Sequence, residues 1–150
     1  MSNYHQDHIP PGMLLRVIQD KQLKIAYYDQ LYKMTSEHLN REIINGIHFD
    51  EVNHLNMFTN LYTDLYGEKP DLTEPEIAQI SSFLYGIKNL IKIELDSYDF
   101  YSNVFFTDPN TMVYEVFARA LTDENRHAAK CNFIYTELLE NNIGKESRSE

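Results

Sequence analysis

The sequence predicts an all-α protein, a single antiparallel four-helix bundle, and three observations support this fold class. Five Gly and five Pro among 150 residues leave little room for the many tight turns of an all-β fold. Apolar residues recur at spacings of three and four through four long segments, which is the helical period. The helix-breaking residues gather mainly near the N-terminus and around residues 67–75, between those segments. A chain of 17.7 kDa suits one domain.

Each helix has start and stop signals in the sequence. We expect helices at about 13–34, 37–66, 76–106 and 109–140. Thr35 or Ser36 can cap the second, and Gly67 to Pro70 end it. The stretch Thr73-Glu74-Pro75-Glu76 has capping-box form and predicts the start of the third. Asp108-Pro109 predicts that of the fourth. The bundle would span residues 13–141, with a flexible segment at 1–12 and a polar tail at 142–150.

Composition excludes several classes of function. The net charge of −10 argues against a nucleic-acid or anionic-membrane partner, since both need basic surface. A single cysteine, Cys131, excludes an internal disulfide framework and any four-cysteine metal site, and its place in the pattern predicts a buried core residue. No apolar run is long enough to span a membrane, and residues 1–12 lack the apolar core of a signal peptide. We therefore expect a soluble, cytoplasmic protein.

The chain contains an internal repeat. A shift of 73 residues places Glu51 on Glu124 and His54 on His127, and apolar positions follow the same register. Further pairs that coincide are Asp50 with Asp123, Tyr28 with Tyr101, Tyr62 with Tyr135, Val17 with Leu90 and Leu61 with Ile134. The sequence thus predicts two helix pairs related by a pseudo-twofold axis.

The repeat carries a chemical motif, D-E-x-x-H, at residues 50–54 and again at 123–127. Residues three apart share one helical face, so each Glu and its His can bind the same ion. Each motif lies within an apolar stripe, which directs this face inward, where an unpaired carboxylate is costly. Glu94 interrupts the apolar face of the third helix and is a further candidate ligand. One such motif means little, but two in register predict a metal site.

In these residues the chain resembles the ferritin-like superfamily, and within it the rubrerythrin-type di-metal carboxylate bundles. The resemblance runs from about Leu14 to Leu139 and rests on FDEVNHLNMFTNLY (49–62), ELDSYDFY (94–101) and LTDENRHA (121–128). It implies that Glu51 and Glu124 bridge two iron or manganese ions, with His54 on one and with His127 and Glu94 on the other. It also implies reaction with oxygen or peroxide, and a homodimer is compatible with it. Asp50 and Asp123 would orient a histidine ring or remain plain surface carboxylates.

The sequence departs from that family at one position. The repeat partner of Glu94 is Lys21, so an ammonium group replaces the carboxylate of the first helix. Three carboxylates and one Lys leave a charge of −2, which one divalent ion neutralises, so one ion per chain is favoured over two. A buried Lys21 would then replace the ion on the His54 side. Alternatively, Lys21 extends to solvent and the site is broken.

Two functions from different classes follow. The first is a ferritin-like oxidoreductase that binds iron or manganese and reacts it with oxygen or peroxide; with one cysteine it has no rubredoxin-type iron site. The second is a non-catalytic bundle, an assembly or storage component with a degenerate metal site, which Lys21 favours. The tyrosines near the motifs are expected to pack in the core: Tyr27, Tyr28, Tyr98 and Tyr101.

Overall fold

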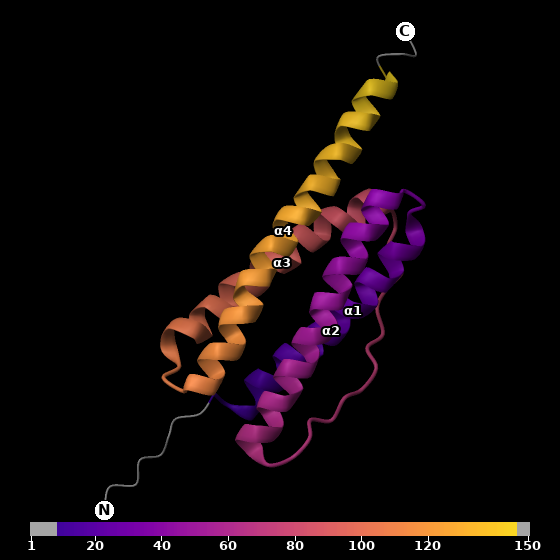
Figure 1. Cartoon of the computed structure of the whole chain (residues 1–150). Helices are drawn as coiled ribbons and strands as arrows, with labels where there is room; N and C mark the ends of the chain where they lie inside the picture. Colours follow the sequence, from indigo (N-terminus) through magenta and orange to yellow (C-terminus); the bar gives the residue numbers. More distant parts are fainter. Residues whose placement is uncertain (1–8, 147–150) are drawn as a thin grey trace, which may run out of the picture.

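The computed structural model describes residues 9–146 and contains four helices (Figure 1). They are α1 (Pro11–Met34), α2 (His38–Tyr66), α3 (Phe83–Thr107) and α4 (Thr111–Glu146). Residues 9–146 contain no β-strand, so the all-α four-helix prediction is confirmed. Most of the N-terminal segment predicted at 1–12 and part of the tail predicted at 142–150 lie outside the described residues. Helix α4 continues to Glu146, and its C-terminal end projects beyond the other three helices (Figure 1).

The helices pack as two antiparallel pairs, α1 with α2 and α3 with α4, and contacts of α2 with α4 and of α1 with α3 close the bundle. The apolar core is divided into two clusters. One contains Leu14, Phe58 and Phe117, and the other contains Leu31, Ile44 and Ile87. A buried Leu, Ile or Phe contributes about 1.5–3 kcal/mol relative to an exposed one. Along α1 the buried positions between these clusters are Lys21 and Lys24, so a charged layer separates the two apolar ones.

The connection between α2 and α3 differs from the prediction. Gly67 ends α2 as expected, in the left-handed conformation at φ 74°. The chain then stays non-helical to Ser82, whose side chain caps α3 by accepting a hydrogen bond from the Tyr85 N–H. The helix predicted to begin at 76 is therefore wrong over 76–82. Within this stretch Ile80 is buried, and its N–H donates to the side chain of Gln30.

The distance that the connection must span explains why residues 76–82 are not helical. Helices α2 and α3 run in the same direction, so the connection has to return along the whole bundle (Figure 1). A helix of the 25 residues of α3 is about 37 Å long. Extended chain covers about 3.3 Å per residue against 1.5 Å in a helix. If residues 76–82 were helical, the extended residues left in the connection could not span the length of the bundle. The required span therefore outweighs the capping-box signal at residues 73–76.

Two helix caps also differ from the prediction. Helix α2 is capped by Glu37, whose carboxylate accepts hydrogen bonds from the N–H groups of Leu39 and Asn40, rather than by Thr35 or Ser36. Helix α4 begins after Asn110, whose side-chain oxygen accepts from Met112 and Val113 at 2.9 and 3.3 Å. Asp108 instead ends α3. Both corrections shift a helix start by one or two residues and leave the bundle unchanged.

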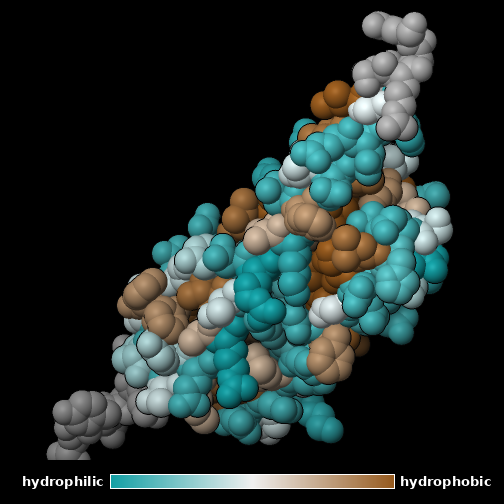
Figure 2. Space-filling model, turned by 45° about the horizontal axis from the view of Figure 1, so that its top comes forward, coloured by the Kyte–Doolittle hydropathy of each residue, from teal (hydrophilic) through white to brown (hydrophobic). Residues whose placement is uncertain are grey.

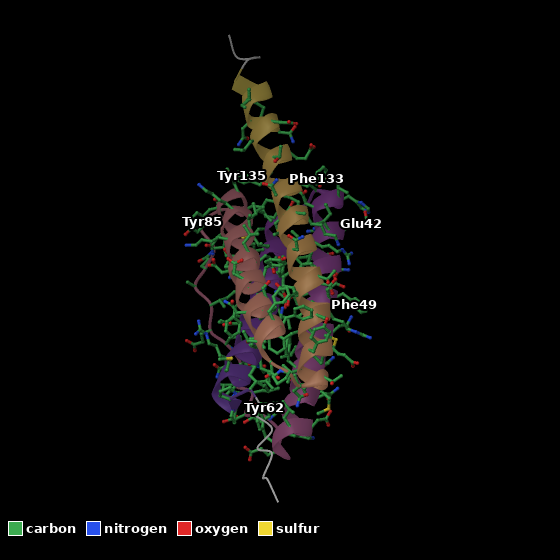
Figure 3. The ribbon with its side chains drawn as sticks, turned by 90° about the vertical axis from the view of Figure 1, so that its left-hand side faces the viewer. Glu42, Phe49, Tyr62, Tyr85, Phe133 and Tyr135 are labelled. Atoms are coloured by element: carbon green, nitrogen blue, oxygen red, sulfur yellow. The ribbon has the colours of Figure 1, made fainter. Side chains whose placement is uncertain are left out.

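The surface carries both hydrophilic and hydrophobic side chains. On the face shown in Figure 2, hydrophilic residues predominate and hydrophobic side chains reach the surface in patches between them. Phe49, Tyr85 and Phe133 project outward from α2, α3 and α4 (Figure 3) and are about half exposed or more. Within residues 9–146, no helix combines the length and the apolar character that crossing a lipid bilayer requires.

Candidate metal centre

The charged layer brings together side chains from all four helices. Its members are all buried, with relative exposures of 0–3%. Helix α1 contributes Lys21 and Lys24, α2 contributes Glu51 and His54, α3 contributes Glu94, and α4 contributes Glu124 and His127. All five residues that the sequence predicts as ligands therefore lie in one layer. A helical stripe that is apolar above and below holds each of them inside the bundle.

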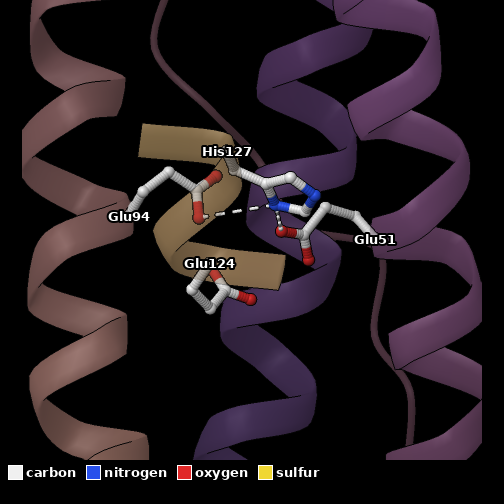
Figure 4. A group of neighbouring side chains, drawn as sticks. All are labelled: Glu51, Glu94, Glu124 and His127. Carbon is white, nitrogen blue, oxygen red and sulfur yellow. Dashed lines mark hydrogen bonds and ion pairs between the residues drawn. The ribbon is translucent and has the colours of Figure 1, made fainter. Parts of the chain in front are cut away.

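Four of these residues form a group that could hold a metal ion. Glu51, Glu94, Glu124 and His127 each offer one ligand atom, and these four atoms lie within 4.8 Å of one another. Figure 4 shows the three carboxyl groups and the imidazole converging from α2, α3 and α4. Three carboxylates with one imidazole form a donor set that suits manganese and ferrous iron. His54 is not a member of this group.

Lys21 occupies the His54 side of the layer. Its Nζ lies 2.8 Å from Glu51 Oε2, donates a hydrogen bond to Glu124, and is 3.5 Å from His54 Nδ1. The same ammonium lies 5.0 Å from the centroid of the Tyr101 ring. Lys21 is 0% exposed, so the alternative in which it extends to solvent is wrong. Its positive charge lies where three of the side chains expected around a second ion converge.

Lys24 occupies the His127 side, and the sequence reasoning missed it. Its Nζ lies 2.7 Å from Glu94 Oε2 and also donates to Glu124, while Glu51 Oε1 is 3.8 Å away. The internal repeat does not identify Lys24 as a residue of the centre, because Ser97 occupies the corresponding position in the second half of the chain. A signal was nevertheless present, since Lys24 lies three residues after Lys21 and four before the buried Tyr28, on the apolar face of α1.

The two histidines are held by aspartates from the opposite motif. Asp123 Oδ2 lies 2.8 Å from His54 Nε2, and Asp50 Oδ2 lies 3.1 Å from His127 Nε2. The orienting role expected of these aspartates therefore matches the geometry, but each acts across the α2–α4 contact. The second ring nitrogen differs between the two. His127 Nδ1 faces Glu51 Oε1 at 3.2 Å, whereas His54 Nδ1 faces the Lys21 ammonium and must accept.

Two tyrosines that coincide in the repeat have different hydroxyl environments. Tyr28 donates to Glu94 Oε1 at 2.7 Å and lies 3.5 Å from the sulfur of Cys131, which is buried as predicted. Tyr101 is 1% exposed, and its hydroxyl has no hydrogen-bond partner among residues 9–146. Tyr28 thus contributes more than packing. The difference follows from Lys21, because the residue that corresponds to the acceptor Glu94 is itself a donor on the Tyr101 side.

No family model matches the chain, and no solved structure matches it either. A relative is found in Bacillus subtilis (strain 168), where the protein YhjR is described as uncharacterized. It is 30% identical over 129 residues, which cover 83% of this chain and 86% of YhjR. The chain belongs to the YhjR family. Because the description of YhjR states no activity, the chemistry of this family member is argued from the residues of the centre.

Burial and ion pairing shift the acid–base behaviour of this YhjR relative in opposite directions. Burial raises the pKa of Glu124 to about 8, even though Lys21 opposes the shift. Burial alone would also raise the pKa of Glu51, but Lys21 and Lys24 hold it well below its ordinary value. For His127 burial lowers the pKa, but the bond to Glu51 and the contact with Glu94 outweigh it and raise the pKa to about 10. Between about pH 8 and about pH 10, where Glu124 is ionised and His127 is still protonated, three carboxylates balance two ammonium groups and one imidazolium.

A cavity of about 410 Å³ adjoins the charged layer in this member of the YhjR family, between α1 and α3. Its wall is largely apolar, with Leu23, Phe100 and Ile77 of the long connection among its residues. Lys24 and Tyr101 reach this cavity from the centre, and Asp20 lines it from α1. Lys21 and the four residues of the Glu/His group do not line it. Lys24 therefore separates the cavity from the carboxylates.

Proposed function

We propose that this protein is a ferritin-like metal-binding bundle that holds one divalent iron or manganese ion per chain. Glu51, Glu94, Glu124 and His127 would be the ligands. The convergence of four buried donor atoms within 4.8 Å is the observation that carries this proposal. A buried carboxylate needs a compensating cation, and three of them in one layer need more than one.

The choice of one ion rather than two rests on Lys21. Its ammonium contacts Glu51, Glu124 and His54, which are the residues that the resemblance assigns to the second ion. With 0% exposure, an ion pair to Glu51 and a hydrogen bond to Glu124, Lys21 supplies a fixed positive charge there. Ferrous iron in the remaining half would supply one-electron chemistry toward oxygen or peroxide. The chain's own contribution is a dry site in which Asp50 fixes the His127 ring so that Nδ1 faces the carboxylates.

A second candidate function is favoured by a specific observation, the bonding of Lys24 to Glu94 and Glu124. When Glu124 is ionised, the two ammonium groups and a protonated His127 balance the three carboxylates of the layer without any metal. The protein would then be a metal-free structural bundle, in which ion pairs replace the ancestral ions. This is the non-catalytic alternative that the sequence already favours through Lys21.

Metal analysis of the purified chain distinguishes the metal-binding function from the metal-free structural bundle. The protein is treated with chelator, dialysed against Mn²⁺ or anaerobic Fe²⁺, freed of excess metal, and analysed for ions per chain. About one ion per chain that Glu94→Gln removes, and that the exposed control Glu115→Gln retains, supports the metal-binding function. No retained ion in a folded protein supports the metal-free bundle. Two ions would show that Lys21 does not replace one of them.

A further inference from the structure

Lys24 and the metal ion of the proposed function would compete for the same oxygens. Lys24 Nζ bonds Glu94 Oε2 and Glu124, and both residues belong to the group that could hold an ion. Lys21 and Lys24 already share Glu124, so a divalent ion among the same carboxylates would be a third cation in a buried layer and would be strongly repelled. An ion can therefore bind there only if the Lys24 ammonium leaves.

The cavity between α1 and α3 offers a place for that ammonium. Lys24 lines this cavity, whereas Lys21 does not, so the cavity offers space to Lys24 and not to Lys21. At about 410 Å³ the cavity is much larger than an ammonium group. A lysine side chain has four rotatable bonds, so its head can move while the backbone stays in the helix.

Asp20 and Tyr101 are polar residues of this cavity wall whose side-chain oxygens have no hydrogen-bond partner in the described part of the chain. Asp20 makes no hydrogen bond or ion pair with any other residue between 9 and 146, and burial raises its pKa. It precedes Lys24 by four residues, which is the helical spacing and order that favour an acid–base pair. Tyr101 lines the same cavity, and its buried hydroxyl has no hydrogen-bond partner within residues 9–146. A carboxylate and a hydroxyl are together suitable acceptors for an ammonium group.

We propose that Lys24 is a displaceable cation, which moves from Glu94 and Glu124 to Asp20 and Tyr101 when a divalent ion binds. The inference rests on the proposed function. It assigns unequal roles to the two buried lysines, since Lys21 remains as a fixed charge and Lys24 exchanges with the ion. It also makes Asp20 a determinant of metal affinity, although Asp20 is not one of the four candidate ligands.

A double-mutant cycle with Mn²⁺ tests this exchange. Dissociation constants are measured by equilibrium dialysis for the full chain and for Asp20→Asn, Lys24→Met and the double variant. Asp20→Asn should weaken Mn²⁺ binding roughly fivefold or more, because the displaced ammonium loses its acceptor. Lys24→Met should strengthen binding. In the Lys24→Met background Asp20→Asn should change the dissociation constant less than about twofold. Asp99→Asn removes one exposed carboxylate from α3 away from the cavity and is the matched control.

The outcomes separate this inference from the proposed function. If Lys24→Met binds Mn²⁺ and the wild type does not, Lys24 is a permanent occupant, and the exchange is refuted while the ligand group stands. If neither binds Mn²⁺, both proposals fail. Equal effects of Asp20→Asn and Asp99→Asn also refute the exchange. Should Lys24→Met not fold, a crystal structure of the wild type with Mn²⁺ decides, since Lys24 Nζ must lie beside Asp20 and no longer beside Glu94.

Discussion

Lys21 Nζ lies 2.8 Å from Glu51 Oε2, and both side chains are 0% exposed. Within the part of the chain that the structure describes, Glu51 Oε2 has no conventional hydrogen-bond partner, so this ion pair compensates its charge. Breaking a buried ion pair by removing one partner typically costs about 3–5 kcal/mol, because an uncompensated charge remains. Removing either partner of this pair should therefore strongly destabilise the folded protein.

Lys21→Glu should destabilise the metal-free protein by at least about 3 kcal/mol, since it both removes the cation and adds a fourth carboxylate. Mn²⁺ should restore much of this loss, because an ion that binds only the folded state shifts unfolding by mass action. The metal content should then rise from one ion per chain toward two. Urea denaturation with and without Mn²⁺ measures the first effect, and metal analysis the second.

Lys92→Glu makes the same charge change at an exposed position of α3 and is the control. It should alter the free energy of unfolding by no more than about 0.5 kcal/mol. A Lys21→Glu variant as stable as this control without metal would contradict the role of Lys21 in the charge balance.

His127→Ala should lower the metal content more than His54→Ala. His127 Nδ1 faces Glu51 and Glu94 at 3.2 and 3.8 Å, whereas His54 Nδ1 faces the Lys21 ammonium. His54 Nδ1 is also 3.7 Å from two of the carboxylates, but of the two histidines only His127 belongs to the group that could hold an ion. Metal analysis of both variants after identical Mn²⁺ loading is the measurement. Equal losses, or a larger loss with His54→Ala, would argue against the asymmetric centre.

The free energy of unfolding without metal should fall as the pH rises above about 5. In the folded chain the pKa values of Glu124 and His127 are raised to about 8 and about 10, from 4.5 and 6.5. The folded state therefore binds both protons more tightly than the unfolded state. The two protons contribute fully to the free energy of unfolding at pH values below the pKa values of the unfolded state. This contribution is lost as the pH passes the folded-state pKa values of about 8 and then about 10.

Metal binding should have the opposite pH dependence, because carboxylate and imidazole ligands must release these protons. The increase in melting temperature caused by Mn²⁺ should accordingly be larger near pH 8 than near pH 6, roughly the range over which Glu124 loses its proton. Thermal unfolding at several pH values, with Mn²⁺ and with chelator, gives the slope of melting temperature against pH in each condition. Parallel slopes in the two series would mean that the ion does not displace these protons.

Gly86→Ala should destabilise the fold, whereas Gly46→Ala should stabilise it. A Cβ atom at Gly86 would lie 2.5 Å from Leu31 Cδ2 and 2.8 Å from Ile80 Cγ2, where α3 meets α1 and the long connection. Overpacking of this kind costs about 1–3 kcal/mol. At Gly46, in the middle of α2, a Cβ meets nothing within 4 Å, so the helix propensity of alanine should add about 0.5–1 kcal/mol. Equal effects in urea denaturation would mean that the contact at Gly86 relaxes without cost.

The bundle, the buried layer and five residues of that layer could be predicted because the internal repeat and the helical period are visible in the sequence without knowledge of how the helices pack. Glu51 and Glu124 coincide in the repeat, and their helical faces point inward. Lys24 was missed because its repeat partner is Ser97 and because lysine is usually exposed. The crossed pairing of Asp50 with His127 depends on how α2 and α4 slide against each other, which no local pattern encodes. The extended course of residues 76–82 likewise follows from the direction of α3 rather than from its own residues.

The distribution of charges between the two helix pairs has a consequence for assembly. The α1–α2 pair brings Lys21, Lys24 and Glu51 to the centre, a net charge of +1, while the α3–α4 pair brings Glu94, Glu124 and the protonated His127, a net charge of −1 when Glu124 is ionised. One pair is therefore cationic at its inner face and the other anionic. Two copies of the first hairpin would place four ammonium groups together, and two copies of the second would place four carboxylates together. The halves of this internally duplicated chain are thus no longer interchangeable, and each hairpin is electrostatically suited to its unlike partner.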